Sequence, residues 1–224
     1  MSERQIAKRL RMKQRTVSRL LKRAGLSRAR DLEPIEPPNR YEHDKPGDLL
    51  HLDIKKLGKF GRPGHRVTGS RVGRAPDRGR GWEFVHVCID DHSRVAYVEI
   101  LEDETKATCT AFLRRAVAWY RQQGIRVRRI LTDNGGGYRS YPFRDAISEL
   151  GLRHSFTKPY TPRTNGKAER FIQTLLREWA YARLYRRSSD RRRALPGYIR
   201  HYNEKREHGS LGGKPPIARL RNHP

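Results

Sequence analysis

A turn that leads directly into an amphipathic helix, in residues 161–179, constrains the fold of this chain more than any other stretch. Pro162 and the Asn165-Gly166 pair are turn-forming residues that interrupt any regular element before them. Apolar residues then recur at spacings of three and four, at Ala168, Phe171, Ile172, Leu175, Leu176 and Trp179. This spacing predicts a helix with one buried face. Glu169 lies in its first turn, where the helix dipole favours a carboxylate.

Two other carboxylates occur at the ends of apolar runs that are typical of buried strands. Asp53 lies in residues 49–57, and Asp133 follows residues 127–132. In the first run, the aliphatic residues alternate with polar ones, so that Leu50, Leu52 and Ile54 are interleaved with His51, Asp53 and Lys55. Because side chains alternate across a strand, we expect Asp53 on the side opposite the aliphatic residues.

Each of the three acids, taken alone, is also consistent with a structural role. Asp53 precedes a pair of lysines with which it can form an ion pair. Asp133 can form an Asx-turn with the Asn134-Gly135 pair that follows it. Glu169 is surrounded by cationic residues, namely Arg163, Lys167, Arg170 and Arg177. The order and spacing of the acids, rather than any one of them, therefore indicate a shared function.

Asp53 precedes Asp133 by 80 positions, and thirty-five residues separate Asp133 from Glu169. Motifs around the acids extend through nearly the whole chain: His51-Leu-Asp-Ile-Lys-Lys-Leu, Phe84-Val-His-Val-Cys-Ile-Asp-Asp-His-Ser-Arg, Thr132-Asp-Asn-Gly, Pro159-Tyr-Thr-Pro-Arg-Thr-Asn-Gly-Lys-Ala-Glu-Arg, His201-Tyr-Asn and Leu211-Gly-Gly-Lys-Pro-Pro. In these motifs the chain resembles the integrases and transposases with an Asp, Asp, thirty-five, Glu triad. It is most similar to bacterial insertion-sequence transposases of the IS481 type, and it is also similar to retroviral integrases.

Residue patterns alone predict an α/β protein. They indicate strands at 49–57, 84–89 and 95–101, a helix at 107–121, a strand that ends at Asp133, a helix at 142–150, a strand at 152–156, and helices after Gly166 and at about 194–203. The resemblance implies the more specific fold. It is an RNase H-like core, a mixed five-stranded sheet flanked by helices, preceded by a small all-α helix-turn-helix domain.

The resemblance also implies the chemistry, that of a DDE-type polynucleotidyl transferase. Asp53, Asp133 and Glu169 would hold two Mg²⁺ or Mn²⁺ ions, with Asp53 bridging both, and Asn134 would support the site. Such ions can stabilise both the attacking and the departing oxygen of a phosphodiester. The implied activity is DNA cleavage at the ends of a mobile element, followed by transfer of the strand into target DNA. The implied partner, besides these DNA duplexes, is a second copy of the chain, in a homodimer or a higher oligomer.

Two alternative functions remain open at this point. One keeps the metal site but limits the activity to endonuclease cleavage. The other is a catalytically idle DNA-binding protein, such as a repressor of transposition made from a shortened gene. Related transposases commonly carry another helix-turn-helix before the one predicted here, and this sequence begins without it.

The charge of the chain indicates a nucleic-acid partner. Fifty Lys and Arg against 24 Asp and Glu give a formal net charge of +26 and a pI near 11.0, which favours a polyanion. No apolar run has the length of a membrane-spanning helix or the position of a secretory signal. Cys88 and Cys109 lack the spacing of a zinc site, so we expect free thiols. We therefore expect a bacterial cytoplasmic protein associated with the nucleoid, without a membrane or small-molecule partner.

Residues 1–31 are expected to form a helix-turn-helix segment, because two short helical patterns are joined by a short basic connection. This segment holds eleven Lys and Arg against one acid through residue 30. The second helix is expected to contact DNA in the major groove through Gln14, Arg15, Thr16, Ser18 and Arg19. A basic helical hairpin that packs on the core without contacting bases is the alternative.

The rest of the chain divides into three predicted parts. Residues 32–47 are a Pro-rich linker, residues 48–185 are the catalytic core, and residues 186–224 are a basic C-terminal helix and tail. Lys167 and Arg170 are expected to grip the DNA end beside Glu169, and Lys158 and Tyr160 are further candidates. The Gly-rich basic stretch 58–81 is either a DNA-gripping loop or a solvated insertion.

Asp90 and Asp91 are two further carboxylates, and neither is assigned to the predicted active site. They lie in the connection Asp90-Asp-His-Ser-Arg94 between two apolar runs, the pattern of a β-hairpin. Because acids in such connections usually form turns, both are predicted to be turn formers.

Overall fold

The computed structural model describes residues 3–24, 26, 42–61, 81–157 and 165–221. The chain divides into two compact units, residues 1–41 and 42–224. The DNA-contact predictions for Lys158 and Tyr160 lie outside the described residues, as do those for most of the stretch 58–81.

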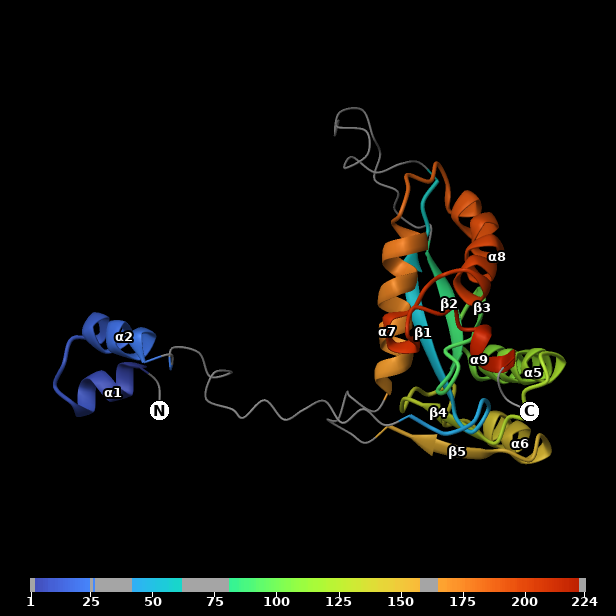
Figure 1. Cartoon of the computed structure of the whole chain (residues 1–224), viewed down its shortest axis with the longest axis horizontal. Helices are drawn as coiled ribbons and strands as arrows, with labels where there is room; N and C mark the ends of the chain where they lie inside the picture. The colour runs from blue at the N-terminus through green and yellow to red at the C-terminus, as the bar shows by residue number, and fades with distance from the viewer. Residues whose placement is uncertain (1–2, 25, 27–41, 62–80, 158–164, 222–224) are drawn as a thin grey trace. The chain divides into compact units, whose positions relative to one another are not determined.

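A five-stranded mixed sheet forms the centre of the larger unit, with the strand order β3-β2-β1-β4-β5 (Figure 1). Its strands are β1 (Leu50–Gly58), β2 (Trp82–Asp90), β3 (Ala96–Leu101), β4 (Arg129–Thr132) and β5 (Arg153–Phe156). The first three strands pair antiparallel, whereas β4 pairs parallel with both β1 and β5. The predicted mixed five-stranded sheet is thereby confirmed.

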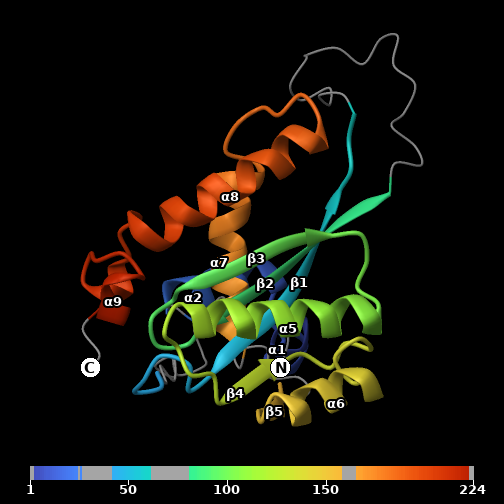
Figure 2. The same cartoon turned by 90° about the vertical axis from the view of Figure 1, so that its right-hand side faces the viewer.

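Helices cover both faces of this sheet, as the two separate apolar cores require. One face carries α5 (Lys106–Gln122) and α6 (Tyr141–Glu149), and the other carries α7 (Gly166–Leu175) and α8 (Ser188–Glu204). In Figure 2, α5 crosses in front of the sheet and α7 lies behind it. Alternation along the strands supplies both cores, since Leu50 and Leu52 face α5 while Val85 and Val87 face α7.

The predicted amphipathic helix after Gly166 is present as α7, and it continues into a π-helical turn, Leu176–Ala180. Trp179, the last residue of the predicted apolar face, lies buried in the second core. Its indole Nε1 donates a hydrogen bond of 3.0 Å to the carbonyl oxygen of Arg191 in α8. This bond links the two helices that cover the same face of the sheet.

Helix α8 begins at Ser188, earlier than the start predicted near residue 194. The Asp190 carboxylate accepts a hydrogen bond from the backbone N–H of Arg187, which supports this earlier start. Arg191 is only 2% exposed and donates to Glu83 Oε2 at 2.6 Å and to the Gly58 carbonyl at 2.9 Å. A buried arginine paired with a residue 108 positions away is invisible to a search for apolar periodicity. The segment 186–221 thus packs on the core.

The N-terminal unit contains the two predicted helices, α1 (Glu3–Arg9) and α2 (Gln14–Arg23). Their shared apolar contact is small, because only Ala7 and Val17 are buried among the described residues of this unit. Leu20 is 50% exposed, and Leu10 is 60% exposed. None of the helices in the described part of the chain is long and apolar enough to cross a membrane.

The buried pair of Arg191 and Glu83 makes a prediction about stability. We expect Arg191→Met to lower the free energy of unfolding by about 3–5 kcal/mol, because it leaves the Glu83 carboxylate buried without its main partner. The same substitution at Arg193, whose side chain is 82% exposed, should cost less than about 1 kcal/mol. Urea unfolding of both variants measures this difference. Equal losses would contradict a special role for the buried pair.

Candidate active site

The parallel pairing of β1 with β4 brings two of the three predicted acids to one region of the sheet. Asp133 directly follows β4, at its carboxyl end. Asp53 lies within β1, two residues beyond His51, where the pairing with β4 ends. The sequence predicted Asp53 at the end of a strand. This prediction is wrong, because β1 continues to Gly58. Asp53 lines a cavity together with Cys109 and Tyr138, two residues of the core that also contains Leu50 and Leu52. Its predicted direction, away from that core, stays a prediction.

Glu169 approaches the same region from a different element. It lies in the first turn of α7, the helix that packs against β1 and β2. Its neighbours Ala168 and Phe171 are buried in the core between α7 and the sheet, so they fix this turn of the helix. Glu169 itself is exposed to solvent.

Electrostatics indicate that the three carboxylates are near one another. Burial raises the pKa of Asp53 to about 6, although the backbone N–H of Ile54 donates to its Oδ1 at 2.7 Å. The negative charges of Asp133 and Glu169 raise the pKa of Asp53 further. Across the described ranges, no three or more His, Cys, Asp or Glu side chains have the spacing of bound metal ligands. Asp133 and Glu169 are therefore near enough to Asp53 for their charges to affect its pKa.

A cavity of about 270 Å³ lies beside Asp53 and Asp133. Its lining comprises these two acids together with Ile54, Glu104, Cys109, Gly135, Gly136, Gly137 and Tyr138. The Asp133 carboxylate accepts a hydrogen bond of 2.9 Å from the backbone N–H of Gly135, which is the predicted Asx-turn. Asn134 donates to the Thr157 carbonyl at 3.0 Å. It therefore ties the residues after β4 to those after β5.

The residues of this cavity fit a hard divalent cation. Carboxylate oxygens are the ligands that Mg²⁺ prefers, and few are needed because the ion keeps several waters. A cation would also relieve the repulsion that raises the pKa of Asp53. In addition, the hydroxyl of Tyr138 is buried in the lining and has no hydrogen-bond partner among the described residues. Such a hydroxyl is suited to a water molecule in the cavity.

The residues predicted to contact DNA have different surroundings. In α2, Gln14, Arg15 and Arg19 are exposed, while Thr16 and Ser18 are half-buried. A shallow hollow in this unit is lined by Glu3, Gln14, Arg15, Ser18, Arg19 and Lys22. Arg170 is exposed and donates to Gln173 at 3.3 Å. The Lys167 ammonium is instead paired with Asp91.

Sequence reasoning missed the role of Asp91. The prediction of a turn former fits Asp90, whose carboxylate accepts from the Ser93 N–H and hydroxyl, both at 2.6 Å. Asp91 also lies in the turn, but its carboxylate is fully buried and is bonded outside the turn, to His51 and Lys167. Although burial disfavours its charge, the hydrogen bonds from these two side chains hold the pKa of Asp91 well below its usual range. Two acidic neighbours in one connection give no sequence signal that distinguishes them.

The mixed five-stranded sheet with helices on both faces defines an RNase H-like α/β core. Residues 43–162 match the integrase core domain family, and residues 150–216 match a second family description of the same name. The chain therefore belongs to the integrase core domain family.

Several known proteins are similar to parts of the chain. It is 37% identical over 96 residues, 43% of its length, to a retrovirus-related Pol polyprotein from transposon TNT 1-94 of Nicotiana tabacum, and this region covers 7% of that protein. It is 34% identical over 91 residues, 41% of its length, to the putative transposase InsD for insertion element IS2E of Escherichia coli, of which this region covers 42%. The chain thus spans less than half the length of these relatives.

Solved structures share the fold at low sequence identity. The catalytic core domain of HTLV-2 integrase in complex with magnesium superposes with a TM-score of 0.54 and 17% identity, over 77% of this chain and 95% of that one. The simian T-cell lymphotropic virus intasome in complex with PP2A regulatory subunit B56 gamma gives a TM-score of 0.61 and 20% identity, over 100% of this chain and 75% of that one.

The glycines beside Asp133 make a prediction about the cavity. A Cβ on Gly137 would lie 2.6 Å from Cys109 Sγ and 2.9 Å from the Glu104 carbonyl, whereas a Cβ on Gly136 would meet no atom of the described residues within 4 Å. We expect Gly137→Ala to cost about 1–3 kcal/mol of unfolding free energy and Gly136→Ala less than about 0.5 kcal/mol. Thermal unfolding of the pair checks this. A stable Gly137→Ala variant would contradict the close packing under the cavity.

Proposed function

We propose that this protein is a transposase that cleaves DNA at the ends of a mobile element and joins the cut strand to target DNA. The observation that carries the proposal is the cavity lined by both Asp53 and Asp133, beside which the charge of Glu169 also raises the pKa of Asp53. Membership of the integrase core domain family supports it. The +26 charge of the chain supports a polyanionic substrate.

In this proposal the three acids hold Mg²⁺ or Mn²⁺, two ions in each active site. When bound, such ions stabilise the charge on the attacking and departing oxygens of the phosphodiester. Asp53 is half-buried, and a less polar surrounding strengthens the attraction of a carboxylate for a cation. Asn134 holds the segment after Asp133 in place through its bond to the Thr157 carbonyl.

DNA contacts in this proposal come from both units of the chain. Arg170, exposed in the same helical turn as Glu169, provides a positive charge beside the acids. In the N-terminal unit, Arg15 and Arg19 are exposed on α2 and can read bases in the major groove. Cleavage and joining of two element ends requires that they be held together, so we propose a homodimer or a higher oligomer on DNA.

The carboxylates provide the first test of this function. We expect Asp53→Asn and Glu169→Gln each to abolish Mg²⁺-dependent nicking and strand transfer on a labelled element end, because each removes a ligand charge, while the affinity for DNA is retained. Glu149→Gln, an equivalent change on the exposed side of α6, should leave both activities intact. The measurement is product formation with Mg²⁺, with Mn²⁺ and with chelator.

Each outcome of this assay separates the candidate functions. Cleavage with a joined product supports a transposase, and cleavage alone would limit the protein to endonuclease activity. Tight, salt-sensitive binding without cleavage would instead indicate a DNA-binding protein that represses transposition.

The N-terminal unit provides a separate test of DNA recognition. We expect Arg15→Ala with Arg19→Ala to reduce the preference for element-end DNA over random DNA by about 1–3 kcal/mol for each lost base contact. Lys8→Ala with Arg9→Ala removes the same charge from α1 and should weaken binding to both DNAs alike. Fluorescence anisotropy at fixed salt measures the two affinities. Unchanged discrimination in the α2 variant would rule out the predicted recognition helix.

A further inference from the structure

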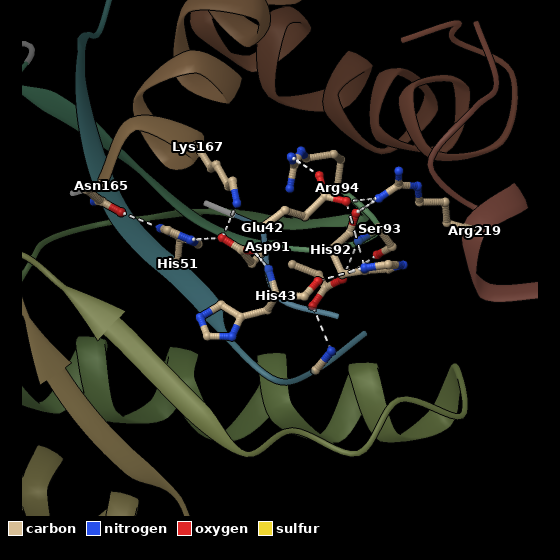
Figure 3. A network of polar contacts seen from close by, with 12 residues as sticks. Glu42, His43, His51, Asp91, His92, Ser93, Arg94, Asn165, Lys167 and Arg219 are labelled. Carbon is tan, nitrogen blue, oxygen red and sulfur yellow. Dashed lines mark hydrogen bonds and ion pairs between the residues drawn. The ribbon is translucent and has the colours of Figure 1, made fainter. Parts of the chain in front are cut away.

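A buried network of polar side chains connects the strand of Asp53 with the helix of Glu169 (Figure 3). Its centre is Asp91, in the connection between β2 and β3, whose side chain is fully buried. Asp91 Oδ1 accepts a hydrogen bond from His51 Nε2 at 2.8 Å and also accepts one from the Lys167 ammonium. One carboxylate oxygen is therefore shared by a side chain of β1 and a side chain of α7.

A second connection joins the same strand and helix. Asn165, directly before α7, is 4% exposed. Its side-chain Nδ2 donates to the Leu52 carbonyl at 3.3 Å, and its Oδ1 lies within hydrogen-bond distance of His51 Nδ1, at 3.1 Å. Both nitrogens of the His51 ring are thus bonded, one toward Asp91 and the other toward the start of α7. Figure 3 shows the ring lying between these two partners.

Residues outside the network hold Asp91 and its neighbours in place. The backbone N–H of His43 donates to Asp91 Oδ2 at 2.7 Å, and the His43 carbonyl accepts from His92 Nδ1 at 2.8 Å. Glu42 binds Arg94 at 2.8 Å and also binds Arg219 of the C-terminal helix α9 (Ala218–Arg221). The position of Asp91 is therefore set by segments from both ends of the larger unit.

Two residues of the network are close in sequence to the predicted active-site acids. His51 lies two residues before Asp53 on β1, and Lys167 lies two residues before Glu169 on α7. A buried charge pair tolerates few geometries, because a displaced partner leaves the other charge buried and uncompensated. A shift of the first turn of α7 along the sheet would break the contacts of both Lys167 and Asn165.

We propose that Asp91, His51, Lys167 and Asn165 form a positioning network that sets the place of Glu169 relative to Asp53. These residues act through the acids and do not themselves contact the DNA or the metal. Lys167 in particular has a structural role in this proposal, since its ammonium is bonded to a buried carboxylate and its side chain is 17% exposed. The catalytic consequence rests on the proposed function, whereas the structural consequence does not.

The structural consequence is tested by hydrogen exchange in the full-length protein. We expect Asp91→Asn and Lys167→Met each to raise the amide exchange rate in the first turns of α7, residues 166–173, because both remove the central ion pair. Asp90→Asn is the matched control, with the same change at a neighbouring buried acid whose partners are Ser93 and Gly47. It should lower the melting temperature without a selective rise in α7. Unchanged exchange in both network variants, or an equal rise in the control, would overturn the proposal.

The catalytic consequence is tested on the same proteins. We expect Asp91→Asn and Lys167→Met to slow single-turnover cleavage at saturating DNA by about 10–100-fold, with the Kd for DNA unchanged. Lys167→Arg, which keeps the charge, should recover most of the rate. If Lys167→Met weakens DNA binding and Asp91→Asn does not, Lys167 contacts DNA and the proposal is wrong.

A failure of the proposed function can be distinguished from a failure of the positioning network. In that case the wild-type protein would not cleave DNA with any metal, and the exchange measurement alone would decide whether the network positions α7.

Discussion

The parallel pairing of β1 with β4 is the constraint on which the rest of this structure depends. β4 pairs with β1 at Leu50 and His51 and ends at Thr132, so this single pairing brings Asp53 and Asp133 into one region although 80 positions separate them in sequence. The antiparallel strands β2 and β3 extend the sheet on the other side of β1 and complete its two apolar faces. Helix α7 packs on one of these faces, and Glu169 reaches the same region from there.

The edge of the sheet farthest from the acids is closed by α8. Asn203 donates to the Ala96 carbonyl at 2.8 Å and accepts from the Ala96 N–H at 2.9 Å, so one side chain replaces a missing neighbouring strand at the start of β3. Farther along the helix, Arg191 bonds to Glu83 on β2 and to the end of β1. Because α8 also contacts α7 through Trp179, the C-terminal region supports the helix that carries Glu169.

Local patterns are sufficient to predict the strands, α5, α6 and the start of α7, because each of these elements buries apolar residues at a regular spacing. They give only the α/β class, and the RNase H-like topology follows from the family motifs. The missed features all involve buried charges. Arg191 and Glu83 are 108 positions apart, and Lys167 and Asp91 are 76 apart. A charged residue looks solvent-exposed in sequence until its distant partner is known, so the local pattern indicates a turn former at Asp91 and a shorter helix at α8.

The separation of roles between Lys167 and Glu169 follows from helix geometry. Side chains two positions apart on a helix do not face each other, so the lysine and the acid point in different directions from the same turn. Lys167 turns to Asp91, where its charge is balanced by a carboxylate outside the set of Asp53, Asp133 and Glu169. If the ammonium lay against Asp53 or Glu169 instead, it would compete with a divalent ion for the same oxygens. In the proposed network, Asp91 therefore both anchors the helix and holds this cation away from the acids, so that their negative charge would be available to the proposed metal ions.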